Sequence, residues 1–149
     1  MDDQPHDRRY RPADRIMQGV IPYLSLAGKA GEAADFYMKA FAAKDIGRMP
    51  FPDKAGFMHL QVEINGGALM LTDHVGEGSE AGTPLRRGHL QLVVPDGKAW
   101  FDRAVAAGCE AVMPFTRQDW GDDWGMLRDP FGLLWAVLTP DPALWDKGA

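Results

Sequence analysis

The same series of expected elements occurs twice along this chain. Residues 20–73 predict a strand, a helix rich in alanine and aromatic residues, and a strand hairpin, and residues 88–139 predict the same series. Within the two expected helices, Ala40-Phe41-Ala42-Ala43 is echoed by Ala104-Val105-Ala106-Ala107 at an offset of about 64 residues. This duplication predicts an α+β fold of tandem βαβββ modules, with curved mixed sheets around a pocket.

Composition shifts along the chain predict where the modules begin and end. The start is polar and carries a run of arginines, which is typical of a flexible tail, and the segment between the modules is rich in Gly, Glu and Ser, which is typical of a linker. We therefore expect one domain over residues 18–149. The expected parts are a tail at 1–17, module one at 18–73, a linker at 74–87, module two at 88–140 and a C-terminal extension at 141–149.

The hairpin of the first module predicts which side chains share a sheet face. Asn65-Gly66-Gly67 tolerates the positive φ of a tight turn between two strands. Because side chains alternate along a strand, one face is aliphatic and the other is mixed. The aliphatic face, expected to contact the helix, holds Leu60, Val62, Ile64, Leu69 and Leu71. The mixed face holds His59, Gln61, Glu63, Ala68, Met70 and Thr72; we expect Glu63 at a solvated strand end, with a role as a general base as the alternative.

The second module predicts a similar division. A strand over residues 89–94 places His89 and Gln91 opposite its helix-facing leucines. Asp96 is a candidate N-cap and Gly108 a candidate C-terminal stop for the following helix. Two mixed faces that curve toward each other would enclose a pocket, which is the usual place for a small ligand.

Composition excludes several classes of function. The net charge is −5 and the basic residues are scattered apart from the arginines near the start, so a nucleic-acid partner is not expected. No stretch approaches the roughly 20 apolar residues of a membrane span, so no membrane partner is expected either. Cys109 is the only cysteine, which fits a reducing cytoplasm and a small apolar packing role.

Several motifs resemble the vicinal oxygen chelate superfamily, which includes glyoxalase I, bleomycin and fosfomycin resistance proteins and extradiol dioxygenases. They are Asp35-Phe36-Tyr37 in the first helix and Asp129-Pro130-Phe131-Gly132 in the last hairpin. Three further stretches are similar to its PhnB-like branch: Ile21-Pro22-Tyr23-Leu24, Leu69-Met70-Leu71-Thr72-Asp73 and Trp120-Gly121-Asp122-Asp123-Trp124-Gly125. The resemblance implies a glyoxalase-like fold.

The resemblance also implies where a metal would be held. Metal-dependent members of the superfamily place His or Glu at four positions, which fall here at Ile21, Met70, His89 and Ala136. Among these, only His89 can bind a divalent ion, whereas a catalytic site generally needs about three protein ligands. We therefore expect a dismantled metal site and no cofactor.

These observations predict a PhnB-like protein, homodimeric and cytoplasmic, that binds a small organic molecule in a metal-free pocket. The expected ligand-binding residues are Tyr23, His59, Gln61, Met70, Thr72, Gln91, Trp120 and Trp124. The tryptophans are expected near the pocket mouth, with closure of the core edge or a dimer contact as the equal alternative. The competing hypothesis is a lyase, isomerase or dioxygenase-type enzyme. In that case His89 would be a catalytic base or a metal ligand, with further ligands such as His59 or Glu63 from a second copy.

Overall fold

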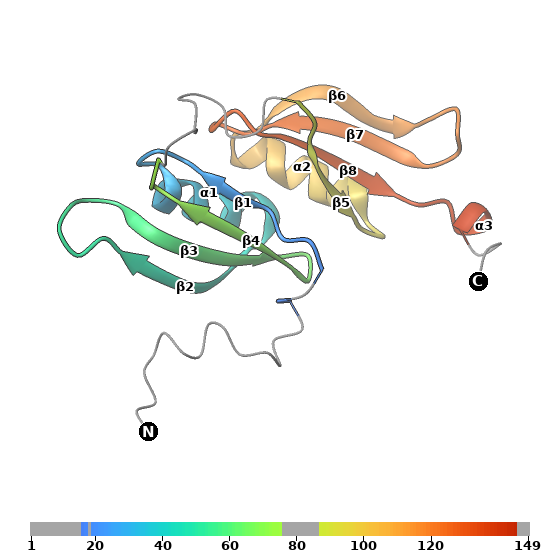
Figure 1. The fold of residues 1–149 in the computed structure, drawn as a ribbon. Helices are drawn as coiled ribbons and strands as arrows, with labels where there is room; N and C mark the ends of the chain where they lie inside the picture. Colours follow the sequence, from blue (N-terminus) through green and yellow to red (C-terminus); the bar gives the residue numbers. More distant parts are fainter. Residues whose placement is uncertain (1–15, 18, 76–86, 146–149) are drawn as a thin grey trace. The chain divides into compact units, whose positions relative to one another are not determined.

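The computed structural model describes residues 16–17, 19–75 and 87–145, which form two compact units, each built on a four-stranded mixed sheet (Figure 1). The first contains β1 (Tyr23–Ser25), all but the last three residues of α1 (Ala30–Phe41), β2 (Lys44–Pro50), β3 (Phe57–Ile64) and β4 (Gly67–Thr72); Lys39–Phe41 group with the second unit. The second contains β5 (Leu90–Val93), α2 (Gly97–Ala107), β6 (Glu110–Arg117), β7 (Asp123–Arg128) and β8 (Leu134–Thr139), followed by α3 (Pro142–Trp145). Residues 1–15 of the expected tail, 76–86 of the expected linker and 146–149 of the expected extension lie outside the described residues.

The two sheets have the same topology. The strand orders are β1-β4-β3-β2 and β5-β8-β7-β6. β1 runs parallel to β4, and β5 runs parallel to β8, while the other neighbouring strands are antiparallel. This arrangement confirms the α+β fold with two βαβββ modules. The enclosure of a pocket by the two sheets, and the assignment of residues 18–149 to a single domain, stay predictions.

The first hairpin has the expected turn and register. Asn65 and Gly66 both have positive φ, at 52° and 80°, and they form the two-residue connection between β3 and β4. The register pairs Leu60 with Leu71 and Gln61 with Met70. The aliphatic face is buried as predicted, since Leu60 and Leu71 have no exposed surface.

The ends of the helices differ from the expectation in two places. The helical spacing of apolar residues predicts that the first helix reaches Ala43, yet α1 ends at Phe41. Ala42 adopts a left-handed conformation, with φ 52°, and its N–H donates to the Tyr37 carbonyl. Asp96 occupies the N-cap position of α2 as predicted, but its side chain makes no capping hydrogen bond.

The second unit packs α2 against β6, β7 and β8. The Phe101 and Phe115 rings lie 5.9 Å apart between helix and sheet. A Cβ built on Gly125 of β7 would lie 2.8 Å from the Phe115 backbone, so only glycine allows β7 to pass so closely. Cys109 is buried, as its predicted packing role requires.

We expect Asp73→Ala to lower the free energy of unfolding by about 2 kcal/mol, because one carboxylate receives three backbone N–H groups. Its Oδ1 accepts from Gly28 at 2.8 Å and Ala30 at 2.9 Å, where α1 begins, and its Oδ2 accepts from Phe57 at 2.9 Å. Urea unfolding followed by circular dichroism measures the loss. Asp53→Ala, at an exposed position, is the control; equal losses in the two variants would contradict this role for Asp73.

Candidate functional site

The mixed face of the first sheet, called here the first mixed face, consists of Tyr23, His59, Gln61 and Met70. Met70 on β4 pairs with Tyr23 on β1 and with Gln61 on β3, so the three side chains form one row across the sheet. The Tyr23 hydroxyl lies 2.7 Å from His59 Nδ1, and the two ring centroids are 5.4 Å apart. His59, Gln61 and Met70 are all buried. The structure therefore brings these predicted residues together.

Met17, the last residue of the expected tail, also belongs to this site. Gln61 has no exposed surface, and its Nε2 donates to the Met17 sulfur at 3.1 Å. Gln61 Oε1 is buried without a hydrogen-bond partner among the described residues. Ile16, next to Met17, is only 8% exposed. No periodic pattern near residue 17 indicates this contact.

Two other residues of the same strands have structural partners. The Thr72 hydroxyl donates to the Met58 carbonyl at 2.7 Å and accepts from the His74 N–H at 3.0 Å, so the backbone uses both of its functions. The interpretation of Glu63 as a solvated strand end is wrong. Glu63 is 9% exposed and its carboxylate lies 3.7 Å from Lys44 Nζ on β2.

The mixed face of the second sheet, called here the second mixed face, presents His89, Gln91, Trp120 and Trp124. His89 Nε2 lies 3.3 Å from Gln91 Oε1, and the His89 ring lies edge-on to Trp124 with centroids 6.4 Å apart. Trp120 and Trp124 are likewise edge-on, at 6.2 Å. Where His59, Gln61 and Met70 of the first mixed face are buried, His89 and Gln91 are exposed and Trp120 is 54% exposed, so the second mixed face is the more open one. The four predicted residues thus form one aromatic and polar cluster.

Apolar side chains continue this face toward β6. Gln91 is in register with Ala136, which pairs with Met126, which in turn pairs with Met113. Met113 is 46% exposed. The second mixed face therefore combines aromatic rings, on which a ligand can stack, with an apolar surface formed by Ala136, Met126 and Met113.

The loop that carries Trp120 is held by an acidic residue. Asp122 is 3% exposed, and its Oδ1 accepts from the Asp141 N–H at 2.9 Å. Trp120 is exposed, so its side chain does not close the core of this unit. Asp122 fixes the loop, and Trp120 remains available to a ligand or to another protein surface.

The four positions that the resemblance assigns to metal ligands do not make a donor set. Ile21 and Ala136 are hydrocarbon side chains, and the Met70 thioether is a soft ligand poorly suited to hard divalent ions. Within the described ranges, no group of three or more His, Cys, Asp and Glu residues could hold an ion. The residues present do not fit a catalytic metal at the inherited position.

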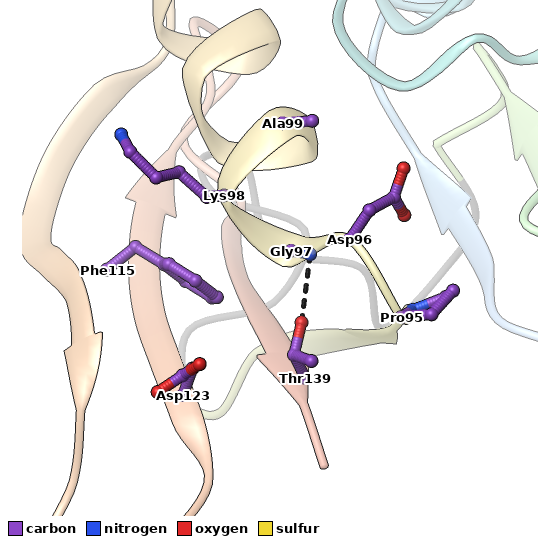
Figure 2. A pocket seen from close by; sticks show the side chains of 8 residues that line it. All are labelled: Pro95, Asp96, Gly97, Lys98, Ala99, Phe115, Asp123 and Thr139. Atoms are coloured by element: carbon purple, nitrogen blue, oxygen red, sulfur yellow. Dashed lines mark hydrogen bonds between the residues drawn. The ribbon is translucent and has the colours of Figure 1, made fainter. Parts of the chain in front are cut away.

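A hollow of about 240 Å³ lies where α2 begins (Figure 2). Figure 2 shows that Gly97 donates its N–H to the Thr139 hydroxyl, at 2.8 Å, and that Phe115 lies beneath the first turn of the helix. Asp123 at its edge pairs with Arg117 at 3.0 Å. The lining residues are Pro95, Asp96, Gly97, Lys98, Ala99, Phe115, Asp123 and Thr139. None is a predicted site residue, and these hydrogen bonds serve the fold.

Among the helices that the structure describes, none is long and apolar enough to cross a membrane.

Comparisons with known proteins agree with this fold. An uncharacterized protein of Mycobacterium bovis is 40% identical over 134 residues, covering 86% of this chain and 87% of its own. The PhnB protein of Bacillus cereus has a similar structure, with TM-score 0.64, 19% identity and coverage of 83% of this chain and 100% of its own. TnmS3, an antibiotic binding protein from Streptomyces, gives TM-score 0.61 at 23% identity and covers 84% of this chain and 98% of its own. The model of the Glyoxalase/Bleomycin resistance protein/Dioxygenase superfamily matches residues 21–137. The chain belongs to this superfamily.

Proposed function

We propose that this protein is a PhnB-like member of the superfamily that binds a small organic molecule without a metal. The observation that carries the proposal is the chemistry at the inherited metal positions. Hydrocarbon and thioether side chains stand at Ile21, Met70 and Ala136. Tyr23 and Gln61 are in register with Met70, and Gln91 is in register with Ala136. Such side chains stack on, enclose and orient an organic molecule, and they do not polarise it as an ion would.

Each mixed face, taken by itself, offers contacts that suit an organic molecule: the second presents aromatic rings for stacking, and the first presents hydrogen-bonding groups. Trp124 lies between Trp120 and His89, so a planar ligand finds several ring surfaces in one place. Tyr23, His59 and Gln61 offer a phenol, an imidazole and an amide. TnmS3 is described as an antibiotic binding protein, and its similar fold supports this class of function.

We expect Trp120→Ala and Trp124→Ala each to weaken binding of a planar aromatic ligand by about tenfold, through lost stacking. A panel of planar aromatic compounds, titrated by calorimetry against the purified protein, measures this. Trp100→Phe is the matched control, because Trp100 lies on α2 beside Arg103, outside both mixed faces. Unchanged affinity in both tryptophan variants would exclude the second mixed face as the ligand site.

We expect divalent metals to bind the protein weakly, with no ion retained after purification without a tag. Elemental analysis of the wild type and of His89→Ala gives the metal content of each. About one ion retained per chain in the wild type and lost in the variant would overturn the metal-free proposal, because it would show that His89 belongs to a functioning metal site.

A second candidate function is proton transfer by His89. The observation in its favour is the exposed imidazole, which contacts both Gln91 and Trp124 and so has a defined orientation. If ligand is turned over, loss of turnover with retained binding in His89→Ala would support this enzyme. Unchanged turnover would remove His89 from the reaction.

We further propose that the protein acts as a cytoplasmic homodimer. The single cysteine, which cannot form an intramolecular disulfide, supports a reducing compartment. Val93, Met113 and Trp120, which are 51%, 46% and 54% exposed, support the burial of apolar surface by a ligand or a second copy. Sedimentation equilibrium of the full chain measures the mass; a monomer at all concentrations would contradict the dimer.

A further inference from the structure

The carboxamide of Gln61 is poorly matched to its surroundings. It is fully buried, its oxygen has no hydrogen-bond partner among the described residues, and its nitrogen donates to a thioether. A thioether is a weak acceptor, and a buried amide oxygen without a donor costs stability. Met70 beside it is buried without such a cost. The fold alone therefore gives no reason for an amide at position 61.

The residues around Gln61 have the character of a binding surface. Met70 separates Gln61 from Tyr23 across the sheet, and Tyr23 is 53% exposed. The amide thus lies in a row with a thioether and a partly accessible phenol ring. A flat, mainly apolar molecule with one polar edge matches this row in chemistry.

The segment Ile16-Met17, called here the strap, covers the amide. Gly19, two positions after Met17, has a left-handed φ of 72°, and a Cβ built on it would meet no atom within 4 Å. A glycine in an uncrowded turn can change conformation without disturbing packed neighbours. The surroundings of Gly19 therefore place no steric obstacle in the way of a rotation that would lift the strap.

We infer that Met17 occupies the place of a ligand's polar edge, and that this edge is a lactam or carboxamide. In a primary carboxamide, one N–H and the C=O point the same way in one plane. A lactam offers an acceptor and a donor in the complementary order, so it makes two parallel hydrogen bonds where the Met17 sulfur makes one. The inference rests on the proposed ligand-binding function and names the class of ligand. Binding then requires displacement of the strap.

The first test needs no ligand. Gln61→Met keeps the length of the side chain and removes the unmatched amide, so we expect its melting temperature to rise by several degrees. Gln91→Met, on the exposed second mixed face, is the matched control and should stay close to the wild type. A melting temperature of Gln61→Met that is unchanged or lowered would overturn the inference, because it would show that the amide serves the fold.

The second test uses 2-quinolinone, a planar lactam, and its N-methyl derivative, which lacks the donor. We expect Met17→Ala to bind 2-quinolinone about tenfold more tightly than the wild type does. Met17→Ala should bind the N-methyl compound about tenfold more weakly than it binds 2-quinolinone. The NMR signals of the Gln61 side-chain amide should shift when 2-quinolinone is added. In Gln61→Met the two compounds should bind equally.

The outcomes separate this inference from the proposed function. Equal binding of the two compounds to Met17→Ala, or unmoved Gln61 signals, would overturn the lactam site. If planar ligands still depend on Trp120 and Trp124 in that case, the proposed function stands without it. Should Met17→Ala not fold, Met17→Val provides a shorter apolar side chain without the sulfur for the same comparison.

Discussion

Asp129→Ala will lower the free energy of unfolding by about 4 kcal/mol, because it leaves several buried donors without an acceptor. Asp129 is 3% exposed. Its Oδ1 accepts from the N–H groups of Phe131 at 2.8 Å and Leu133 at 3.0 Å, and its Oδ2 accepts from the Trp135 indole N–H at 2.9 Å. One carboxylate thus closes the last turn and anchors a tryptophan that is itself 2% exposed.

Urea unfolding followed by tryptophan fluorescence measures this loss. Asp102→Ala is the control, since Asp102 pairs with Lys98 on the exposed side of α2 and should change stability by less than about 0.5 kcal/mol. The free energy of unfolding of Asp129→Asn should lie between those of Asp129→Ala and Asp102→Ala. Its amide keeps an acceptor for the turn but points a donor toward Trp135. Equal stabilities of Asp129→Ala and Asp102→Ala would contradict the anchoring role.

Cys109 will react with a disulfide reagent about 1,000-fold more slowly in the folded protein than in urea at about pH 8. Burial, with a smaller contribution from the negative charge of Asp129, raises the pKa of the Cys109 thiol from 9.0 to about 12. Because the thiolate is the reactive form, each unit of pKa removes about a factor of ten from the reactive fraction. Absorbance-monitored labelling gives both rates; a native rate within tenfold of the unfolded one would contradict the raised pKa.

The same shift has a consequence for stability at alkaline pH. The folded protein keeps the Cys109 proton to about pH 12, whereas the unfolded chain loses it near pH 9. The stability that this group contributes is therefore present below about pH 9 and is lost as the pH rises toward 12. Cys109→Ala should reduce the alkaline loss of stability, which denaturation at several pH values measures.

The strands of the first hairpin could be predicted because their pattern is strict. Alternation in β3 places Leu60 and Val62 on one face and His59 and Gln61 on the other, and Asn65-Gly66 fixes the turn. The end of α1 could not be predicted in the same way. Alanine is the strongest helix former, so nothing in the sequence indicates that Ala42 adopts a left-handed conformation.

The site was predictable where it follows from strand register. His59 and Gln61 share one face of β3, and His89 lies beside Gln91, as the predicted alternation of side chains requires. Met17 was missed because its contact with Gln61 joins residues 44 positions apart and belongs to no repeating pattern. Asp73 was missed as the acceptor at the start of α1 for the same reason, since Ala30 is 43 positions away, whereas the partners of Asp129 lie within six positions of it.

The two sheets share one strand order, yet one mixed face is covered by its own chain and the other is open. Substitutions at the buried positions of the covered face change packing, and they therefore raise or lower the free energy of unfolding. Substitutions at exposed positions such as Gln91, Val93 or Trp120 leave the core untouched. The exposed surface of the second sheet can therefore vary at little cost to the folded core, whereas changes on the first alter buried contacts.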